Sequence, residues 1–304
     1  QELLNIVIVG GGATGIEVAG ILSEMKKFVL PNDYPDMPSS LMHIYLIEAG
    51  PRLLAGMSEE SSAHAEQFLR EMGVNILLNK RVVDYRDHKV VLEDGTEIAT
   101  RTFIWVSGVT GVTIGNLDAS LIGRGGRIKV DSFNRVEGMN NVFAIGDQCI
   151  QLADENYPNG HPQLAQVAIQ QGELLAKNLI RMEKGQEMKP FHYRNLGSMA
   201  TVGRNRAVAE FSKVKMQGWF AWVMWLVVHL RSILGVRNKV IVLLNWVWNY
   251  FTYDQSMRMI VYARKAKEIR DREKVEETTH WGKDLIQEPQ PAKQEPQPNS
   301  KEIV

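Results

Sequence analysis

The most constraining feature of the sequence is an apolar run at residues 6–9 that is followed at once by Gly10-x-Gly12-x-x-Gly15. In a strand–turn–helix unit, Gly10 permits a tight turn, Gly12 lets the backbone approach a pyrophosphate, and Gly15 allows the helix and strand to pack closely. The amino terminus of the following helix offers free N–H groups to phosphate. The motif therefore predicts a nucleotide site, with a plain glycine-rich turn as the alternative.

The residues around this motif are typical of one βαβ unit. We predict a helix over residues 12–29 and a second strand over residues 41–48, with an irregular proline-rich loop at 31–40 between them. Glu48 ends the second strand, where a carboxylate can bond both ribose hydroxyls and repel a 2′-phosphate. This position favours NADH over NADPH, and the alternative is an ordinary carboxylate that faces water.

Two more residues lie near the predicted site. Gly108 follows the apolar run 102–107, which we expect to be a buried strand whose carboxyl end borders the ligand crevice, although Gly108 could also be a simple loop glycine. Glu17 lies two residues after Gly15, in the first turn of the predicted helix. An anion there is stabilised by the helix dipole, so that a capping role and a functional role are both open.

A second nucleotide signature lies at residues 142–148, Val-Phe-Ala-Ile-Gly-Asp-Gln. We predict an apolar strand that ends at Gly146, where a cofactor's pyrophosphate can approach the backbone, and at Asp147, whose carboxylate can accept hydrogen bonds from sugar-chain hydroxyls. This pattern is typical of a bound flavin. Two nucleotide sites on one chain predict electron transfer between two cofactors.

A helix is predicted from about residue 163 to residue 182. If its amino terminus points at a flavin, its dipole stabilises the charge of the reduced ring. Gln166 and Gln170 lie four residues apart, hence on one helix face, and each amide offers a donor and an acceptor. This pair could hold a quinone carbonyl or could be a solvated stripe.

Other segments complete an α/β pattern. We predict a helix at 58–73, a strand at 74–78, a hairpin of 89–92 with 97–99 that turns at Asp94-Gly95, extended structure over 128–145, and a hairpin of 201–202 with 207–208.

The carboxyl-terminal third contains two apolar runs, at 219–228 and 240–251. Both are shorter than the about 20 residues that a spanning helix needs. Tryptophans prefer the headgroup level, and Arg231, Arg237 and Lys239 can pair with anionic lipid, so we expect helices that lie in one leaflet. A buried core or a dimer surface is the alternative. Residues 287–300, rich in Pro, Gln and Lys, are expected to be disordered.

Composition argues against nucleic-acid binding, internal disulfides and a metal site. The 35 basic and 35 acidic residues balance, so nucleic acid is not an expected partner. The single cysteine, Cys149, permits no internal disulfide and fits a reducing compartment such as bacterial cytoplasm. No histidine or cysteine cluster has metal-ligand spacing, so no metal is expected. His161 and His229 are candidate proton donors, with structural roles as the more common alternative.

In combination, these motifs resemble the type II NADH:quinone oxidoreductases, the non-proton-pumping flavoenzymes of the pyridine nucleotide-disulphide oxidoreductase superfamily. The similarity extends over about residues 3–265. The matching stretches are 10–20, 48–49, 105–111, 144–147, 165–166, 170–172, 197–204 and 245–254.

The resemblance implies an oxidoreductase that passes hydride from NADH to FAD and two electrons onward to a membrane quinone. It implies that FAD is touched by Gly146, Asp147, Ala165 and Gln166, and that NADH is bordered by Gly12, Glu48 and Gly108. It further implies that Gln166 and Gln170 frame the quinone pocket and that Glu17 lies near the nicotinamide–flavin junction, with a part in quinone reduction.

The resemblance also implies the wider organisation. Members of the family have an additional glycine-rich strand–turn–helix for FAD at their amino terminus, and we expect this chain to be a fragment that lacks it. We expect an NADH domain at 1–110, the second part of the FAD domain at 111–200, a membrane-anchoring domain at 201–265 and a charged tail at 266–304. A homodimer on the cytoplasmic face of a bacterial inner membrane is expected. The alternatives are a soluble reductase with a protein acceptor, or an inactive NADH-binding fragment.

Overall fold

The computed structural model of the chain describes residues 2–112, 114–212 and 214–252. The chain divides into two compact units, residues 1–247 and 248–304. The predicted domain boundaries at 110, 200 and 265 remain a prediction. The predicted tail at 266–304, including its disordered stretch at 287–300, lies outside the described residues.

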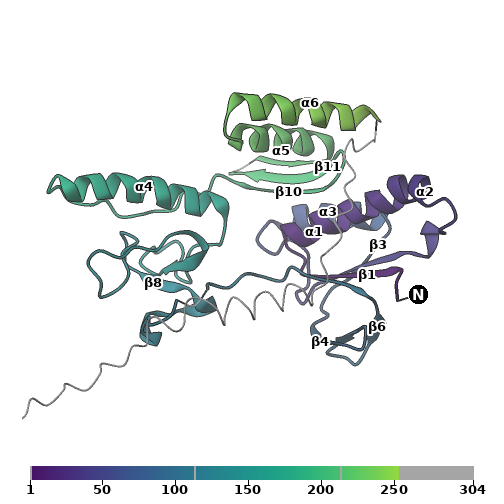
Figure 1. Cartoon of the computed structure of the whole chain (residues 1–304), viewed down its shortest axis with the longest axis horizontal. Coiled ribbons are helices and arrows are strands. Elements are labelled where there is room, and N and C mark those ends of the chain that lie inside the picture. The colour runs from purple at the N-terminus through teal and green to yellow at the C-terminus, as the bar shows by residue number, and fades with distance from the viewer. Residues whose placement is uncertain (1, 113, 213, 253–304) are drawn as a thin grey trace, which may run out of the picture. The chain divides into compact units, whose positions relative to one another are not determined.

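A parallel sheet forms the centre of the amino-terminal part (Figure 1). Its strands lie in the order β3-β2-β1-β7, and this order confirms the predicted βαβ unit and the α/β fold class with a Rossmann-type sheet. The bounds are β1 Asn5–Val9, β2 His43–Ile47, β3 Val74–Leu77 and β7 Thr102–Trp105. Because successive strand side chains point to opposite faces, β1 supplies two separate cores.

The two faces of the sheet are covered differently. Ile6 and Ile8 of β1 face a core that includes Ile16 of α1 (Ala13–Glu24) and Leu69 of α3 (Glu59–Glu71). On the other face, Val7 and its neighbours pack against a small antiparallel sheet. The strands of that sheet are β4 Val82–Arg86, β5 Lys89–Leu92 and β6 Glu97–Ala99. The helix predicted at 58–73 and the predicted hairpin are confirmed, whereas β4 was not predicted.

Two details of the prediction are wrong in this part. The helical path does not end at residue 29, because a π-helical turn η1 (Met25–Val29) leads into α2 (Leu30–Asp33), and a short 3-10 turn η2 follows at Ser39–Leu41. Pro31 is tolerated because it lies in the first turn of α2, where its missing N–H is not needed. Strand β7 is not buried, since among the described strands β1 alone pairs with it, and Trp105 is 55% exposed.

The middle part has a two-stranded parallel sheet of β8 (Ile128–Val130) and β9 (Cys149–Gln151), followed by the predicted helix, α4 (Ala165–Glu183). The predicted extended run through 128–145 is wrong, because a turn reverses the chain at Asn134, whose φ is 63°. The apolar segment 142–145 forms no strand and pairs only through the isolated bridge of Phe143 with Arg135. No neighbouring strand in the described residues completes its pairing.

The carboxyl-terminal part combines an antiparallel sheet with two helices. The predicted hairpin is confirmed as β10 (Ser198–Gly203) and β11 (Arg206–Phe211), and a third strand, β12 (Val214–Gln217), was not predicted. Helix α5 (Gly218–Ser232) packs on β11 through the buried Ala221, and α6 (Val236–Thr252) follows it. Strand β10 also packs against α1, which links this sheet to the Rossmann unit. In the described part of the chain, no helix combines the length and apolar character that crossing a membrane requires.

Candidate active site

The glycine turn after β1 has the geometry that each of its three positions requires. Gly10 has a φ of +115° and donates its N–H to the Ile47 carbonyl (2.9 Å), so the turn is fixed to the end of β2. A Cβ on Gly15 would overlap the Gly10 carbonyl oxygen, which explains the close approach of helix and turn. A Cβ on Gly12 would meet nothing within 4 Å. The turn is therefore tight at Gly10 and Gly15 and open at Gly12.

Helix α1 begins at this open position. Gly12 is its N-cap residue, and no side chain of the described residues caps the helix there. The first-turn N–H groups consequently remain available to an anion beyond Gly12.

Glu48 lies directly after β2 and faces the glycine turn. Its half-buried carboxylate accepts hydrogen bonds from the N–H of Gly11 (2.6 Å) and of Gly50 (2.7 Å). Gly108, with a φ of +87°, follows β7. Because β1, β2 and β7 are parallel, the residues after their carboxyl ends lie along one edge of the sheet. The structure thus brings Gly12, Glu48 and Gly108 to the same edge.

Glu17 is not a capping residue. The helix begins at Ala13, so Glu17 lies beyond the first turn, and the predicted first-turn position is wrong. Thr201, on the neighbouring strand β10, is the residue whose backbone and side chain act to lower the pKa of the Glu17 carboxyl group. Burial raises the pKa of Glu17, and the Thr201 hydrogen bonds and the charge of His229 offset part of that rise. Glu17 is therefore a half-buried carboxyl group on α1, the helix that packs against β10, with a pKa above its ordinary value.

The second glycine turn is held from inside by a residue that the sequence did not single out. Gly146 has a φ of +66°, and its N–H donates to Oε1 of Gln171 (2.7 Å), which is 1% exposed. Asp147 is exposed beside this turn. Gln171 lies four residues after the buried Val167, on the same face of α4. A polar residue in the apolar stripe of a helix is the sequence pattern that could have indicated its buried role.

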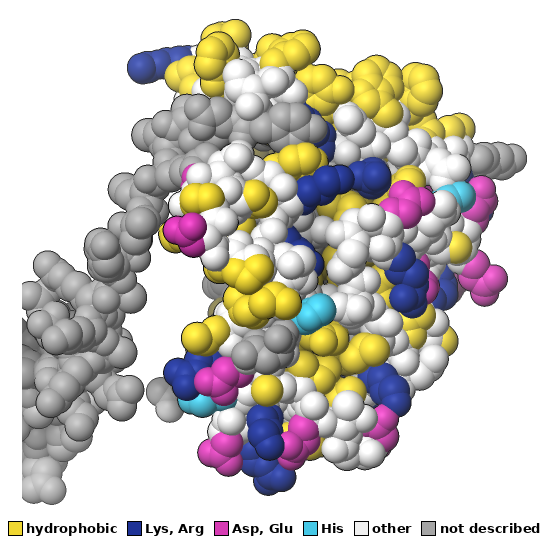
Figure 2. Space-filling view, turned by 90° about the vertical axis from the view of Figure 1, so that its right-hand side faces the viewer, with side chains coloured by type: hydrophobic (Ala, Val, Ile, Leu, Met, Phe, Trp, Pro, Cys, Tyr) yellow, Lys and Arg dark blue, Asp and Glu magenta, His cyan; other side chains and the backbone are white. Residues whose placement is uncertain are grey.

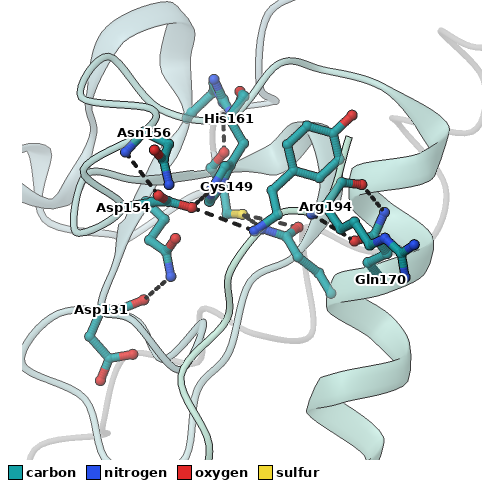
Figure 3. Close-up of polar contacts among 11 residues, drawn as sticks. Asp131, Cys149, Asp154, Asn156, His161, Gln170 and Arg194 are labelled. Atoms are coloured by element: carbon teal, nitrogen blue, oxygen red, sulfur yellow. Dashed lines mark hydrogen bonds and ion pairs between the residues drawn. The ribbon is translucent and has the colours of Figure 1, made fainter. Parts of the chain in front are cut away.

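Gln166 and Gln170 both bind backbone, so neither is part of a solvated stripe. Nε2 of Gln166 donates to the Gly197 carbonyl (3.0 Å), and its Oε1 accepts from the Leu196 N–H (3.0 Å). Gln170 makes the equivalent pair with both backbone groups of Arg194, at 2.9 and 3.1 Å (Figure 3). The two amides therefore clamp the segment 194–197, which leads into β10, onto α4.

A reciprocal amide contact connects the segment after β7 with the second glycine turn. Gln148, next to Asp147, donates from Nε2 to the Val112 carbonyl (2.6 Å) and accepts from the Val112 N–H (2.9 Å). Val112 belongs to the segment that begins at Gly108. The contact ties the residues after β7 to the second glycine turn.

His161 has a structural role. Its Nε2 lies 3.0 Å from Oδ2 of Asp154, and both side chains are buried (Figure 3). The ring also packs against Tyr157, Phe191 and Tyr193. Burial acts to raise the pKa of Asp154, but the hydrogen bonds from His161 and from the Asn156 and Tyr193 N–H groups hold it below its ordinary value. This pair stabilises the loop before α4.

His229 differs from His161. It is exposed on α5, its Nδ1 lies 2.8 Å from the Trp225 carbonyl, and its ring stacks on Trp225 with 3.8 Å between centroids. Its imidazolium form would lower the pKa of Glu17.

Comparison with known families gives two matches. A profile of the pyridine nucleotide-disulphide oxidoreductases matches residues 1–172, and a profile of the NDH2 C-terminal domain matches residues 195–253. These matches define the class as a dinucleotide-dependent oxidoreductase.

Individual relatives point to one family within this class of oxidoreductases. The type II NADH:quinone oxidoreductase NdhA of Mycobacterium tuberculosis is 35% identical over 81% of this chain and 54% of its own length. A mitochondrial internal alternative NAD(P)H-ubiquinone oxidoreductase A1 of Arabidopsis thaliana is 32% identical over 82% of this chain and 52% of its own length. The solved structure of NDH2 from Plasmodium falciparum in complex with NADH shares the fold, with a TM-score of 0.76, 19% identity, and coverage of 84% of this chain and 68% of that chain.

The chain belongs to the type II NADH:quinone oxidoreductase family. It spans about half the length of the curated relatives it matches.

Proposed function

We propose that the protein oxidises NADH and passes the electrons through FAD to a membrane quinone, without pumping protons. The observation that carries the proposal is the Gln148–Val112 contact, because it ties the segment after β7, a strand of the parallel sheet whose edge carries Gly12 and Glu48, to the turn at Gly146. When bound, NADH supplies a hydride, and the flavin accepts it and gives two electrons to the quinone. The chain's own residues bind, orient and hold protons.

The residues present fit a dinucleotide at the first turn. The space beyond Gly12 and the uncapped start of α1 suit a pyrophosphate, which carries the negative charge that a helix amino terminus stabilises. Gly10 and Gly15 hold the turn in shape. Glu48 would accept hydrogen bonds from the ribose hydroxyls while it keeps those from the Gly11 and Gly50 N–H groups. Its charge would repel a 2′-phosphate. The proposed nucleotide is therefore NADH rather than NADPH.

The second turn has the residue types that a flavin requires. Asp147 is exposed and can accept hydrogen bonds from sugar-chain hydroxyls. Ala165 begins α4, and no side chain of the described residues caps this helix either, so its amino-terminal dipole can act on bound FAD. Gln171 keeps the turn at Gly146 rigid from behind.

Glu17 is the proposed source of a proton for the quinone. Reduction of a quinone to a quinol takes up two protons, and a carboxyl group whose pKa is raised by burial keeps its proton closer to neutral pH than an exposed glutamate does. Gln166 and Gln170 lie on the α4 side of the proposed pocket.

The proposed partner of the carboxyl-terminal helices is the surface of a bilayer. Large apolar side chains are exposed along α5 and along the part of α6 up to Val247, and Figure 2 shows hydrophobic side chains gathered over these helices. They include Trp219, Phe220, Val227, Val240, Leu243, Leu244 and Val247, and Leu234 between the two helices is exposed as well. A quinone is dissolved in the bilayer, so this location gives it an entry path. We further propose a homodimer on the cytoplasmic face of a bacterial inner membrane.

Membrane attachment gives one test. Phe220 and Val227 are 72% and 56% exposed, so glutamate at both positions removes apolar contact with lipid, at about 1.5–3 kcal/mol for each side chain, without disturbing a core. We expect the double variant to remain in the soluble fraction in liposome flotation, whereas the parent protein floats. Val83→Glu, an equally exposed site on β4 in the small sheet, is the matched control and should float. A parent protein that stays soluble would favour a reductase with a protein acceptor.

Nucleotide binding gives a second test. Gly12→Ala places a methyl group in the space proposed for the pyrophosphate, and we expect the KM for NADH to rise at least about tenfold. The Tm should not fall, because the added Cβ touches no protein atom within 4 Å. Gly56→Ala, also at an open glycine, should change neither quantity. An unchanged KM in the Gly12→Ala protein would refute the proposed phosphate site.

A further inference from the structure

A strap of irregular chain, residues 106–112, leads away from the end of β7. At its start, the Val106 N–H donates to the Val9 carbonyl of β1 (2.9 Å). The backbone of Ser107 packs against the first glycine turn, because a Cβ added to Gly10 would lie 3.0 Å from the Ser107 Cα. The start of the strap is therefore fixed to the turn that is proposed to bind NADH.

The other end of the strap is fixed at two points. The Gly111 N–H donates to the Gly125 carbonyl (2.7 Å), and a Cβ on Gly111 would collide with the next carbonyl oxygen of that loop. Val112 uses both of its backbone groups to bond the side chain of Gln148, at 2.9 and 2.6 Å. Gln148 is the last residue of η5 (Gly146–Gln148), the helical turn that carries the second glycine. The Gln148 amide therefore ties the strap to the turn that is proposed to bind FAD.

The part of the strap between these anchors is short. It consists of residues 108–110, which are all exposed, and Gly108 has a φ of +87°. From Ser107 to Gly111 the chain spans at most about 14 Å. If the Val112 end is released from Gln148, the slack between the two glycine turns grows by the length of chain that is set free.

We propose that Gln148 is a positioning residue for hydride transfer, which holds the end of the strap at the second glycine turn and thereby fixes the nicotinamide of NADH relative to the flavin. The inference rests on the proposed function. Hydride transfer oxidises NADH to NAD⁺ and reduces FAD by two electrons, and it requires the reacting atoms to approach to about 3–3.5 Å. A misplacement of about 1 Å can slow such a step about 10²-fold.

Direct contact of the Gln148 amide with FAD is the rival that the experiment must separate. Gln148 follows the exposed Asp147, and its amide keeps one N–H and part of its carbonyl oxygen after bonding Val112. A residue that bonded FAD would change the affinity for FAD. A residue that only holds the strap would change the rate of hydride transfer and leave the affinity for both cofactors as it is.

The first experiment compares Gln148→Met with the parent protein, both purified and supplied with FAD. Methionine keeps the length of the side chain and removes both hydrogen bonds to Val112. We expect the rate at which saturating NADH bleaches the flavin absorbance to fall about tenfold, while the Kd for NADH and the Kd for FAD stay within about twofold of the parent values. Oxidation of the reduced flavin by a soluble short-chain benzoquinone should keep its parent rate.

Hydrogen–deuterium exchange tests the contact itself without catalysis. The Val112 N–H is bonded to Gln148 in the parent protein, so in Gln148→Met we expect it to exchange at least about tenfold faster, while peptides from β1 and α4 keep their parent rates. Gln67→Met is the matched control, since its exposed amide also makes a side-chain hydrogen bond, to Glu71 on α3 (2.9 Å). It should change neither the exchange of the strap nor the reduction of the flavin.

Gln148→Glu is the second variant, for use if the methionine protein does not fold. Glutamate keeps an acceptor for the Val112 N–H but turns a second oxygen, in place of the donor, towards the Val112 carbonyl. We expect the same slower reduction of the flavin and the same faster exchange at Val112.

Three outcomes would overturn the inference and leave the proposed function standing. A raised Kd for FAD in Gln148→Met would show that the amide contacts FAD. A parent rate of flavin reduction despite faster exchange at Val112 would show that the strap does not set the geometry of hydride transfer. Equal losses in flavin reduction and in flavin oxidation would show a general structural role. A parent protein whose flavin is not reduced by NADH would overturn the proposed function, and the inference with it.

Discussion

We expect Glu17→Gln to lower the kcat of quinone reduction about 100-fold and to leave the reduction of the flavin by NADH unchanged. The amide keeps the size of the carboxyl group but has no acidic proton to give, and general acid catalysis commonly contributes about 10²–10⁴-fold. The two half-reactions are measured separately, with stopped-flow absorbance for the flavin and steady-state turnover for the quinone. Equal losses in both half-reactions would show that Glu17 supports the fold or NADH binding instead.

Although Glu17→Gln should lower activity, we expect it to raise the stability of the folded protein at neutral pH. Because burial raises the pKa of Glu17 in the folded protein, the contribution of this group is fully favourable only below the ordinary pKa of 4.5 and is lost as pH rises through the folded value. Glutamine removes this loss. We therefore expect Glu17→Gln to have a higher Tm than the parent at neutral pH and the same or a lower Tm in acid. A lower Tm at neutral pH would contradict the assigned direction of the pKa.

Gly20→Ala should destabilise the protein by about 3 kcal/mol, although alanine normally stabilises a helix interior relative to glycine. A Cβ on Gly20 would overlap the Val202 carbonyl oxygen of β10, so α1 and β10 must separate to accept it. Glu17 lies one turn earlier on α1, and its contact with Thr201 should weaken at the same time. Chemical denaturation measures the first effect, and the kcat of quinone reduction measures the second.

Gly172→Ala is the matched control for this prediction. Gly172 is also a helical glycine, in α4, and a Cβ added there would have Ile145 Cδ1 as its nearest neighbour at 3.7 Å, an ordinary van der Waals contact. We expect this protein to gain up to about 1 kcal/mol. If both alanine proteins changed stability in the same direction, the close contact of α1 with β10 would not be the cause.

The sequence predicts well what depends on local backbone geometry. The turn at Gly10, the strand and helix after it, and the helix that contains Gln166 could be read from short patterns, because strand periodicity and glycine placement act over a few residues. The helical path continues to Asp33 rather than ending at residue 29, and Trp105 is exposed rather than buried. Both depend on what packs beside the segment rather than on the segment itself.

In the candidate site, too, local features follow from the sequence, whereas contacts between distant segments do not. The sequence placed Gln166 and Gln170 on one helix face, but their partners at 194–197 are 24 to 31 residues away along the chain. A capping role for Glu17 stayed open because sequence patterns could not place Thr201 beside it. Gly20 belongs to a stretch that resembles the family. The contact that requires glycine there, with the carbonyl of Val202, comes from another sheet, and the sequence does not reveal it.

The central claim, that NADH at the first glycine turn reduces a quinone through FAD at the second, is tested most directly by one measurement. The purified protein, supplied with FAD and bound to quinone-containing liposomes, is given NADH while NADH and quinol are followed together. The account predicts that each NADH oxidised yields one quinol, and that Gly12→Ala slows both at subsaturating NADH. NADH consumption without quinol, or quinol formation that Gly12→Ala leaves untouched, would contradict it.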